Sequence, residues 1–216
     1  MLLFSKRIII AHAYHRGIVT RVVGGQPTSV IKYPFMVSLQ KKAFGHICGG
    51  TYLHGINVLS AAHCFIAHGE VDFRVENPLL FIAIAGASDV NSLYVPSMQI
   101  RLVVHIEVHP RYNNTSKFND IALIRLDRAF TPAKEVLPVA LGPVSIVNEL
   151  LLRSSNATAD PAIFCQVLGW GYLQEASPVS MRNVNVQTSF SVASAARWVI
   201  RHFVMKGMQF YLMYLQ

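Results

Sequence analysis

The chain has 216 residues, of which 52% are hydrophobic and 14% are charged. This composition excludes a disordered protein and is sufficient for one large domain or two small ones with a sizeable core. The formal net charge is +8, and the excess lies before Val22 and after Glu175, where basic residues occur without acidic ones. Because the rest of the chain is neutral and has no zinc-finger spacing or RNA-binding aromatic motif, we expect no nucleic-acid partner.

Residues 1–21 have some features of a secretory leader. A basic segment ends at Arg7, three isoleucines follow it, and Ala11-His12-Ala13 has the small residues of a cleavage site. The apolar run is shorter than that of an ordinary signal peptide, so the leader alone does not establish secretion. No stretch of about 18 apolar residues occurs, and we therefore expect no membrane-spanning helix.

The segment Arg21-Val22-Val23-Gly24-Gly25 allows two interpretations. A protease that cuts after Arg21 would make Val22 a new amino terminus, as in the activation of a precursor. Alternatively, the segment is a loop that contains an arginine by chance.

Seven segments have the alternation or the short apolar runs of β-strands, and glycine or proline residues separate them. They are residues 34–40, 57–62, 81–86, 101–109, 121–126, 167–171 and 178–186. We expect a turn or bulge at Gly49-Gly50, a connection between subdomains at 131–143 and a short helix at 191–199. Apart from the end of this helix, no element is predicted from Arg197 onward. Many short strands with such turns indicate an all-β sandwich or barrel.

The strand at 101–109 carries two histidines four residues apart. On a helix, this spacing could bind zinc, but on a strand it does not converge the rings in that way. Strand alternation predicts one face with Val104, Ile106 and Val108, and an opposite face with His105, Glu107 and His109. We interpret the second face as solvated, and expect neither a metal site nor a cofactor.

The chain contains three cysteines. A bridge between Cys48 and Cys64 would close a loop of about 15 residues, worth roughly 3 kcal/mol, and would imply an oxidising compartment. Cys165 would then be a free thiol, half of a missing pair or a buried apolar residue.

Three sequons for N-glycosylation occur in the sequence. They begin at Asn113, Asn114 and Asn156, and the first two overlap in Asn113-Asn114-Thr115-Ser116. Such matches are common by chance; in a secreted chain they would predict surface loops.

One histidine and one aspartate lie in short motifs that are typical of a known family. The motifs are Ser60-Ala61-Ala62-His63-Cys64 and Asn119-Asp120-Ile121-Ala122-Leu123. With four further segments in the same order, they resemble the trypsin/chymotrypsin family of serine endopeptidases, whose triad is ordered His, Asp, Ser. The four are the segment at Arg21, Pro34-Phe35-Met36-Val37-Ser38-Leu39, Cys48-Gly49-Gly50 and Gly169-Trp170-Gly171. The motifs extend from Val22 to about Val186.

This resemblance implies two antiparallel six-stranded β-barrels of the trypsin-like type, with the site between them. His63 would be the general base, and Asp120 would hold its ring and stabilise the imidazolium. The Cys48–Cys64 bridge would support the histidine turn, and Cys165 would lack its usual partner. Cleavage after Arg21 by an activating protease would free the Val22 ammonium to pair with an aspartate beside the nucleophile.

The family's nucleophile motif, Gly-Asp-Ser-Gly-Gly, does not occur in this sequence. The region about 90 residues after Asp120, where the family order would place the serine, contains none. Ser189, Ser191 and Ser194 lack the neighbouring glycines whose N–H groups would form an oxyanion hole. We therefore divide the chain into a leader and activation segment at 1–21, a peptidase domain at 22–186 and a divergent tail at 187–216. The first barrel would occupy about 28–130, and an incomplete second barrel about 135–186.

Three functional interpretations follow. The first is a secreted, monomeric serine endopeptidase precursor whose complete form hydrolyses peptide bonds, although this chain is inactive because the nucleophile and oxyanion hole are missing. The second is a non-catalytic homologue that binds or regulates other proteins, and the third is a defective product. The partners expected are polypeptide substrates or protein inhibitors. Substrate preference is not predicted, because the residues that would form the specificity pocket are missing.

Overall fold

The computed structural model describes residues 7–11, 26–67, 74–90, 92, 95–141, 164–170, 185–191 and 211–215. Within these ranges the chain forms strands and two short 3-10 helices, η1 and η2. In chain order they are β1 (Arg7–Ala11), β2 (Gln26–Pro27), β3 (Met36–Lys41), β4 (Gly45–His54), β5 (Asn57–Ser60), η1 (Ala62–Phe65), η2 (Pro78–Leu80), β6 (Phe81–Ala85), β7 (Gln99–Val108), β8 (Ala122–Leu126), β9 (Phe164–Gly169), β10 (Asn185–Ser191) and β11 (Tyr211–Leu215).

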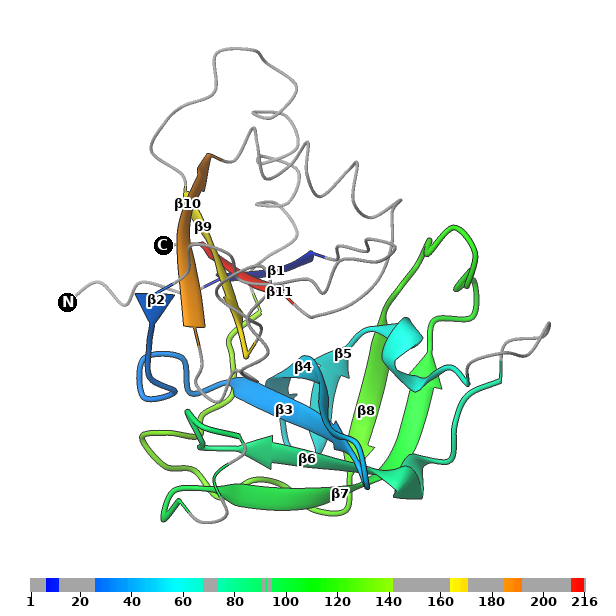
Figure 1. Cartoon of the computed structure of the whole chain (residues 1–216), viewed down its shortest axis with the longest axis horizontal. Coiled ribbons are helices and arrows are strands. Elements are labelled where there is room, and N and C mark those ends of the chain that lie inside the picture. The colour runs from blue at the N-terminus through cyan, green and yellow to red at the C-terminus, as the bar shows by residue number, and fades with distance from the viewer. Residues whose placement is uncertain are drawn as a thin grey trace.

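Six consecutive strands, β3 to β8, close into an antiparallel barrel in the order β3-β4-β5-β8-β7-β6. In Figure 1 this barrel lies below the remaining strands. Closure leaves the barrel without a free edge strand. The predicted all-β class and the predicted first barrel are therefore confirmed.

The barrel encloses one apolar cluster, which strand alternation explains. Val37 and Leu39 of β3 and Phe81 and Ala83 of β6 point inward and are fully buried. Phe65 of η1 joins them and packs edge-on against the ring of Phe81, with 5.1 Å between centroids. The histidine turn that follows β5 is therefore anchored directly in the barrel core.

Gly49 and Gly50 do not form the predicted turn or bulge. They lie within β4, in register with Ser38 and Val37 of β3. The register shift in this pair of strands comes earlier, at Ile47. The close approach of β5 leaves no room for a side chain at Gly50, because an added Cβ would be 2.7 Å from Cγ1 of Val58.

The predicted faces of β7 are wrong at Val104. The pairing of β7 with β8 shifts register between Val103 and His105, so the alternation changes phase there. Val103 is 0% exposed and Val104 is 46% exposed, whereas Ile106 points inward as predicted. His105 is exposed, and His109 follows the end of the strand.

The other five strands form a second sheet in the order β1-β11-β9-β10-β2. The sequence predicted the end of β9 and the start of β10 but not β1, β2 or β11. β1 and β11 pair with each other and fall in the predicted leader and tail. Residues 178–184 of one predicted strand and 192–199 of the predicted helix lie outside the described residues. Ser191, the first residue of that helix, is the last residue of β10.

A second apolar cluster joins the end of β9 to the barrel. Met36 of β3 packs in it with Leu168 and Trp170, and all three are buried. The indole Nε1 of Trp170 donates to the carbonyl of Ser88, 3.0 Å away. This cluster thus joins segments that are more than 80 positions apart in the sequence. The hydrogen bond to Ser88 holds the Trp170 ring in place within the cluster.

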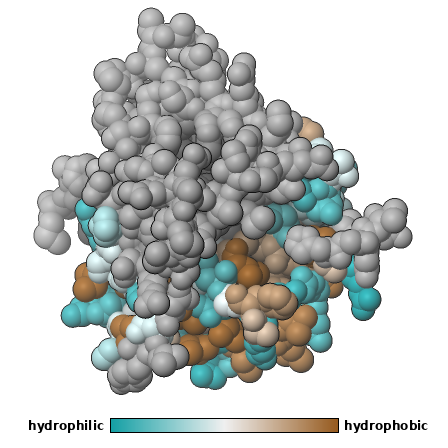
Figure 2. Space-filling view, viewed as in Figure 1, coloured by the Kyte–Doolittle hydropathy of each residue, from teal (hydrophilic) through white to brown (hydrophobic). Residues whose placement is uncertain are grey.

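The barrel surface turned to the viewer in Figure 2 mixes hydrophilic and hydrophobic residues. Exposed apolar side chains of the described region include Ile100, Leu102 and Val104 on the outside of β7. None of the described helices is long and apolar enough to cross a membrane.

Candidate active site

The candidate site lies at one edge of the barrel, where β5 ends and β8 begins. Ser60, the last residue of β5, is in register with Ala122, the first residue of β8. His63 follows β5 within η1, and Asp120 precedes β8. Pairing of the two strands therefore brings together two residues 57 positions apart in the sequence.

Small residues allow the chain to turn tightly into η1. Ala61 and Ala62 are fully buried, and larger side chains would not fit without displacing the core. The N-cap position, Ala61, has no side chain that can accept a hydrogen bond from the first turn. The backbone N–H of His63 is instead bound by Oδ1 of Asp120 at 2.8 Å.

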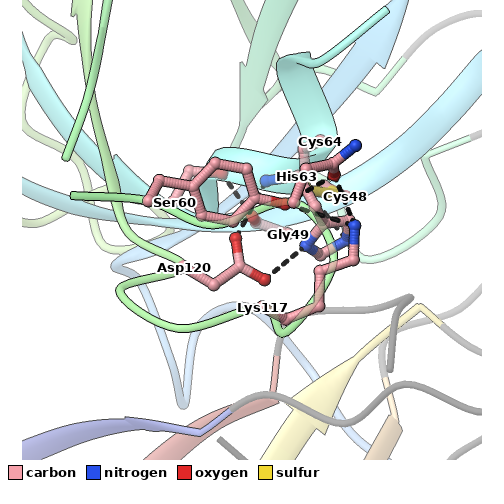
Figure 3. A network of polar contacts seen from close by, with 9 residues as sticks. Cys48, Gly49, Ser60, His63, Cys64, Lys117 and Asp120 are labelled. Atoms are coloured by element: carbon pink, nitrogen blue, oxygen red, sulfur yellow. Dashed lines mark hydrogen bonds and ion pairs between the residues drawn. A yellow bond between two sulfur atoms is a disulfide. The ribbon is translucent and has the colours of Figure 1, made fainter. Parts of the chain in front are cut away.

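The second carboxylate oxygen of Asp120 holds the histidine ring. Oδ2 accepts from Nδ1 of His63 at 2.8 Å, and the aspartate is only 3% exposed. Figure 3 shows the two side chains facing each other. Because Nδ1 carries the proton in this hydrogen bond, the neutral ring has its lone pair on Nε2. The arrangement thus fixes both the tautomer and the orientation of the ring.

A disulfide lies directly beside the histidine. Cys48 of β4 and Cys64 of η1 are bonded, with 6.4 Å between their Cα atoms. The bridge fastens the histidine turn to the neighbouring strand, and Cys64 Sγ is 3.6 Å from Nε2 of His63. The sulfur atoms and the ring lie close enough to suggest a metal cluster. Sulfur atoms in a disulfide are not thiolates, so these residues do not fit a thiolate metal site.

The loop before Asp120 adds polar groups that sequence reasoning missed. Lys117 has its Nζ within 3.3 Å of the Tyr112 hydroxyl and 2.5 Å of Oδ1 of Asn114. Figure 3 draws Lys117 with His63 and Asp120 in one network of polar contacts. No sequence motif indicates this placement, because it depends on the left-handed backbone at Lys117 (φ 59°) and on the fold of the whole loop.

Burial and the charge of Asp120 change the acidities in this loop. Burial raises the pKa of Tyr112, and the negative charge of Asp120 raises it further. Burial lowers the pKa of Lys117, against the opposing effect of Asp120. Tyr112 also packs against Ala62 and Ile66, so the loop is joined to the histidine turn by apolar contact.

A second histidine, His46, is partly buried at a position away from the pair. Nδ1 of His46 lies 2.7 Å from Oγ of Ser38, and its ring packs edge-on against Trp170 with 5.5 Å between centroids. Burial lowers the pKa of His46 to about 4, so this ring is neutral at pH 7. No sequence motif indicates a role for His46.

The remaining candidate residues do not join the pair in the described structure. Cys165 lies in β9, in register with Phe190 and Leu215. Ser189 and Ser191 lie in β10. Arg21, Val22 and Ser194 are outside the described residues, as is the sequon at Asn156.

A six-stranded antiparallel barrel that carries a histidine and a buried aspartate, joined at its edge, is the arrangement of a trypsin-like serine protease. The chain belongs to the Trypsin family, which matches residues 22–207. The match continues past Val186, the approximate end of the segment over which the sequence motifs indicated the resemblance.

Individual relatives agree with this assignment. The chain is 30% identical over 162 residues to the Suppressor of tumorigenicity 14 protein homolog of Bos taurus, covering 75% of this chain and 17% of the relative. It is 28% identical over 169 residues to the Atrial natriuretic peptide-converting enzyme of Homo sapiens, covering 77% and 14%. It is also similar to a solved structure described as "Structure of GrC", with a TM-score of 0.58, 25% identity, and coverage of 77% of this chain and 63% of the other. The chain therefore spans less than a fifth of the length of the two named relatives.

Proposed function

We propose that His63 and Asp120 are the acid–base half of a serine endopeptidase site, whose complete form hydrolyses peptide bonds. The observation that carries this proposal is the two-point contact, in which Asp120 binds both the backbone N–H and the ring Nδ1 of His63. A ring held in this way directs the basic Nε2 at a fixed position.

The mechanism follows from this tautomer. Nε2 of His63 takes the proton of the attacking hydroxyl and later returns it to the leaving amine. Asp120 stays ionised, keeps the other ring proton and stabilises the imidazolium that forms. The human relative is named as an enzyme that converts a peptide, which supports polypeptides as the substrate class.

We propose that the polypeptide of this sequence has negligible peptidase activity by itself. It contains no Gly-Asp-Ser-Gly-Gly segment, and therefore neither the nucleophile nor the oxyanion hole of the family motif. Loss of one triad member alone removes most of the rate, and the residual activity depends on the oxyanion hole.

The organisation of the chain forms part of the same proposal. The peptidase domain would span 22–186 and precede a divergent tail. The part of the five-stranded sheet that lies in this domain, β2, β9 and the start of β10, would be the counterpart of an incomplete second barrel. The Cys48–Cys64 disulfide supports an oxidising, secretory destination. Residues 1–21 would be removed by an activating protease that cuts after Arg21.

The first experiment asks whether any serine in this chain is activated. The full chain, intact or cut after Arg21, is treated with a fluorophosphonate probe, and labelled peptides are sought by mass spectrometry. We expect no labelled serine in either form, as in the His63→Ala control. Labelling that disappears in the control would identify a working nucleophile and overturn the inactivity proposal.

The second experiment concerns the gene product. A transcript that reads from the codon of Val186 into a Gly-Asp-Ser-Gly-Gly segment would support an endopeptidase as the complete form. A chain that binds a protein inhibitor tightly, while no transcript encodes the serine, would instead support the non-catalytic interpretation.

A further inference from the structure

The loop that leads to Asp120 contains the two overlapping sequons. Asn113 is followed by Asn114-Thr115 and Asn114 by Thr115-Ser116, and all of these residues except the partly buried Ser116 are exposed. We propose that Asn113 is an N-glycosylation site and that Asn114 is not. This inference rests on the secretory destination proposed above.

The loop has a defined shape. It is closed at its base by a hydrogen bond from the N–H of His109 to the carbonyl of Ile121, at 3.0 Å. Further out, the N–H of Asn113 donates to the carbonyl of Phe118 at 3.0 Å, and the N–H of Lys117 donates to the carbonyl of Asn113 at 2.7 Å. The two asparagines therefore lie at the start of a compact turn whose last residues lead to the aspartate.

Asn113 is arranged as a sequon acceptor requires. Its Oδ1 accepts from the N–H of Thr115 at 3.0 Å and from the N–H of Ser116 at 2.8 Å. These bonds bring the side-chain amide to the residue two positions ahead, which must carry the hydroxyl in a sequon. In the described part of the chain, Nδ2 of Asn113 makes no hydrogen bond. Since these contacts involve only neighbouring residues, they can form before the rest of the fold.

Asn114 is directed differently. Its Oδ1 accepts from the Tyr112 hydroxyl at 3.0 Å and from Nζ of Lys117 at 2.5 Å. The side-chain amide of Asn114 is therefore held toward Tyr112 and Lys117, and not toward Ser116. An oligosaccharide on Asn114 would be attached to an amide that these two contacts hold against the protein. The structure thus distinguishes two asparagines that the sequence motif treats alike.

The reaction requires a lipid-diphosphate-linked oligosaccharide as donor. Nδ2 of Asn113 forms a bond to the anomeric carbon of the first sugar, and the bond from that carbon to the diphosphate oxygen breaks. The lipid diphosphate leaves with the electron pair, and the amide nitrogen loses one proton. The glycan would then stand on the loop whose other end carries Asp120, where its bulk would restrict access by large partners to that edge of the barrel.

The test uses two substitutions that separate the sequons. Thr115→Ala removes the hydroxyl required by Asn113 but leaves the sequon of Asn114 intact, because alanine is permitted at the middle position and Ser116 is unchanged. Ser116→Ala removes the hydroxyl required by Asn114 and leaves Asn113-Asn114-Thr115 unchanged. Each variant of the full chain is produced in eukaryotic cells behind an added cleavable signal sequence. Glycans are removed by an amidase in heavy-oxygen water, and fragment masses locate the aspartate that results.

We expect the heavy-oxygen label at Asn113, at several-fold higher occupancy than at Asn114. The label should be lost from Asn113 with Thr115→Ala and kept with Ser116→Ala. An occupancy at Asn114 equal to or above that at Asn113 in the unchanged chain, or a label on neither residue, would overturn the proposal. So would a glycan that Ser116→Ala abolishes. Because the added signal supplies entry into the secretory route, the same measurement without it tests the proposed destination separately.

Discussion

Thr51 carries a buried polar atom that forms no hydrogen bond with any described residue. It lies in β4 and is 1% exposed, and its Oγ1 has no hydrogen-bond partner in the described structure. A buried hydroxyl without a hydrogen bond lowers stability, because its hydration is lost without replacement. We predict that Thr51→Val, which keeps the shape and removes the hydroxyl, is neutral or stabilises the fold by about 1 kcal/mol.

Urea unfolding of the two proteins tests this prediction, with Thr51→Ser as the matched control. The serine keeps the unpaired hydroxyl and loses a buried methyl group, so it should destabilise by about 1 kcal/mol. A valine variant clearly less stable than the wild type would mean that the hydroxyl makes a favourable interaction.

His46 makes stability depend on pH. Burial lowers its pKa from 6.5 in an unstructured chain to about 4 in the fold. As the pH falls below 6.5, the unfolded chain therefore takes up a proton that the folded chain does not, and the equilibrium moves toward unfolding. This loss of stability continues until the folded chain also binds the proton, near pH 4.

We predict that the wild type loses about 2 kcal/mol more than a His46→Gln variant between pH 7 and pH 5. The comparison removes contributions from other titrating groups, since they are common to both proteins. Free energies of unfolding from denaturant titrations at several pH values give the difference. Parallel curves for the two proteins would show that His46 titrates alike in both states.

The residues of the candidate site were predictable to different degrees. His63 and Asp120 could be identified because their neighbours form motifs that resemble a known family. Lys117, Tyr112 and His46 could not, because the position of Lys117 depends on the fold of its loop, and Tyr112 and His46 pack against distant segments. The pKa of His46, for example, depends on burial beside Trp170, which follows it by more than 100 positions in the sequence.

At the scale of elements, a glycine at the end of β6 determines how the chain leaves the strand. Gly86 has φ +77°, and an added Cβ would lie 2.1 Å from the carbonyl oxygen of Ser97 and 2.9 Å from Val136. The same region is held by a hydrogen bond from the Ser97 hydroxyl to the Gly86 carbonyl, at 2.7 Å. We predict that Gly86→Ala destabilises by about 3 kcal/mol, through overpacking added to backbone strain.

Gly45, at the start of β4, provides the matched control. Its φ is +78°, almost the same as at Gly86, but an added Cβ would meet no atom within 4 Å. Gly45→Ala should therefore cost only the backbone strain, about 1 kcal/mol. Thermal or denaturant unfolding of both variants separates the two effects, and equal losses would contradict the steric part of the argument.

The positions of five barrel strands followed from alternation and turn residues, but β4, where only a turn or bulge was predicted, and the pairing details did not. The phase change at Val104 arises from a bulge, which depends on the neighbouring strand and not on the local pattern. Gly49 and Gly50 suggested a turn because glycine is common in turns, whereas the close approach of β5 explains Gly50. β1 and β11 are paired with each other across most of the chain length, and such a pairing has no local signal.

At the scale of the whole molecule, the barrel and the five-stranded sheet meet through shared packing. The cluster around Met36, Leu168 and Trp170 includes residues of both parts. Apolar contact of this kind makes the two parts stabilise each other. The Cys48–Cys64 disulfide joins β4 to η1, and both elements belong to the barrel part of the chain. It therefore stabilises the barrel and does not link the barrel to the five-stranded sheet.

The disulfide leads to a prediction about thiols and stability together. Of the three cysteines in the sequence, Cys48 and Cys64 are bonded, so the unfolded but unreduced protein should contain one reactive thiol, that of Cys165. Replacing the bonded pair with serine should lower the free energy of unfolding by about 3 kcal/mol, since the bridge restricts the unfolded chain. The matched control, Cys165→Ser, removes the remaining thiol and leaves this loop closed.

Thiol titration in denaturant and urea unfolding test the two parts separately. We expect the Cys165→Ser protein to have no reactive thiol and to keep most of its stability. The double variant should have a free energy of unfolding lower by about 3 kcal/mol. Adding a reductant should destabilise the wild type and the Cys165→Ser protein equally, and should not affect the double variant. Three reactive thiols in the unreduced wild type would show that the bridge does not form. An undiminished stability in the double variant would show that the barrel alone holds the histidine turn in place.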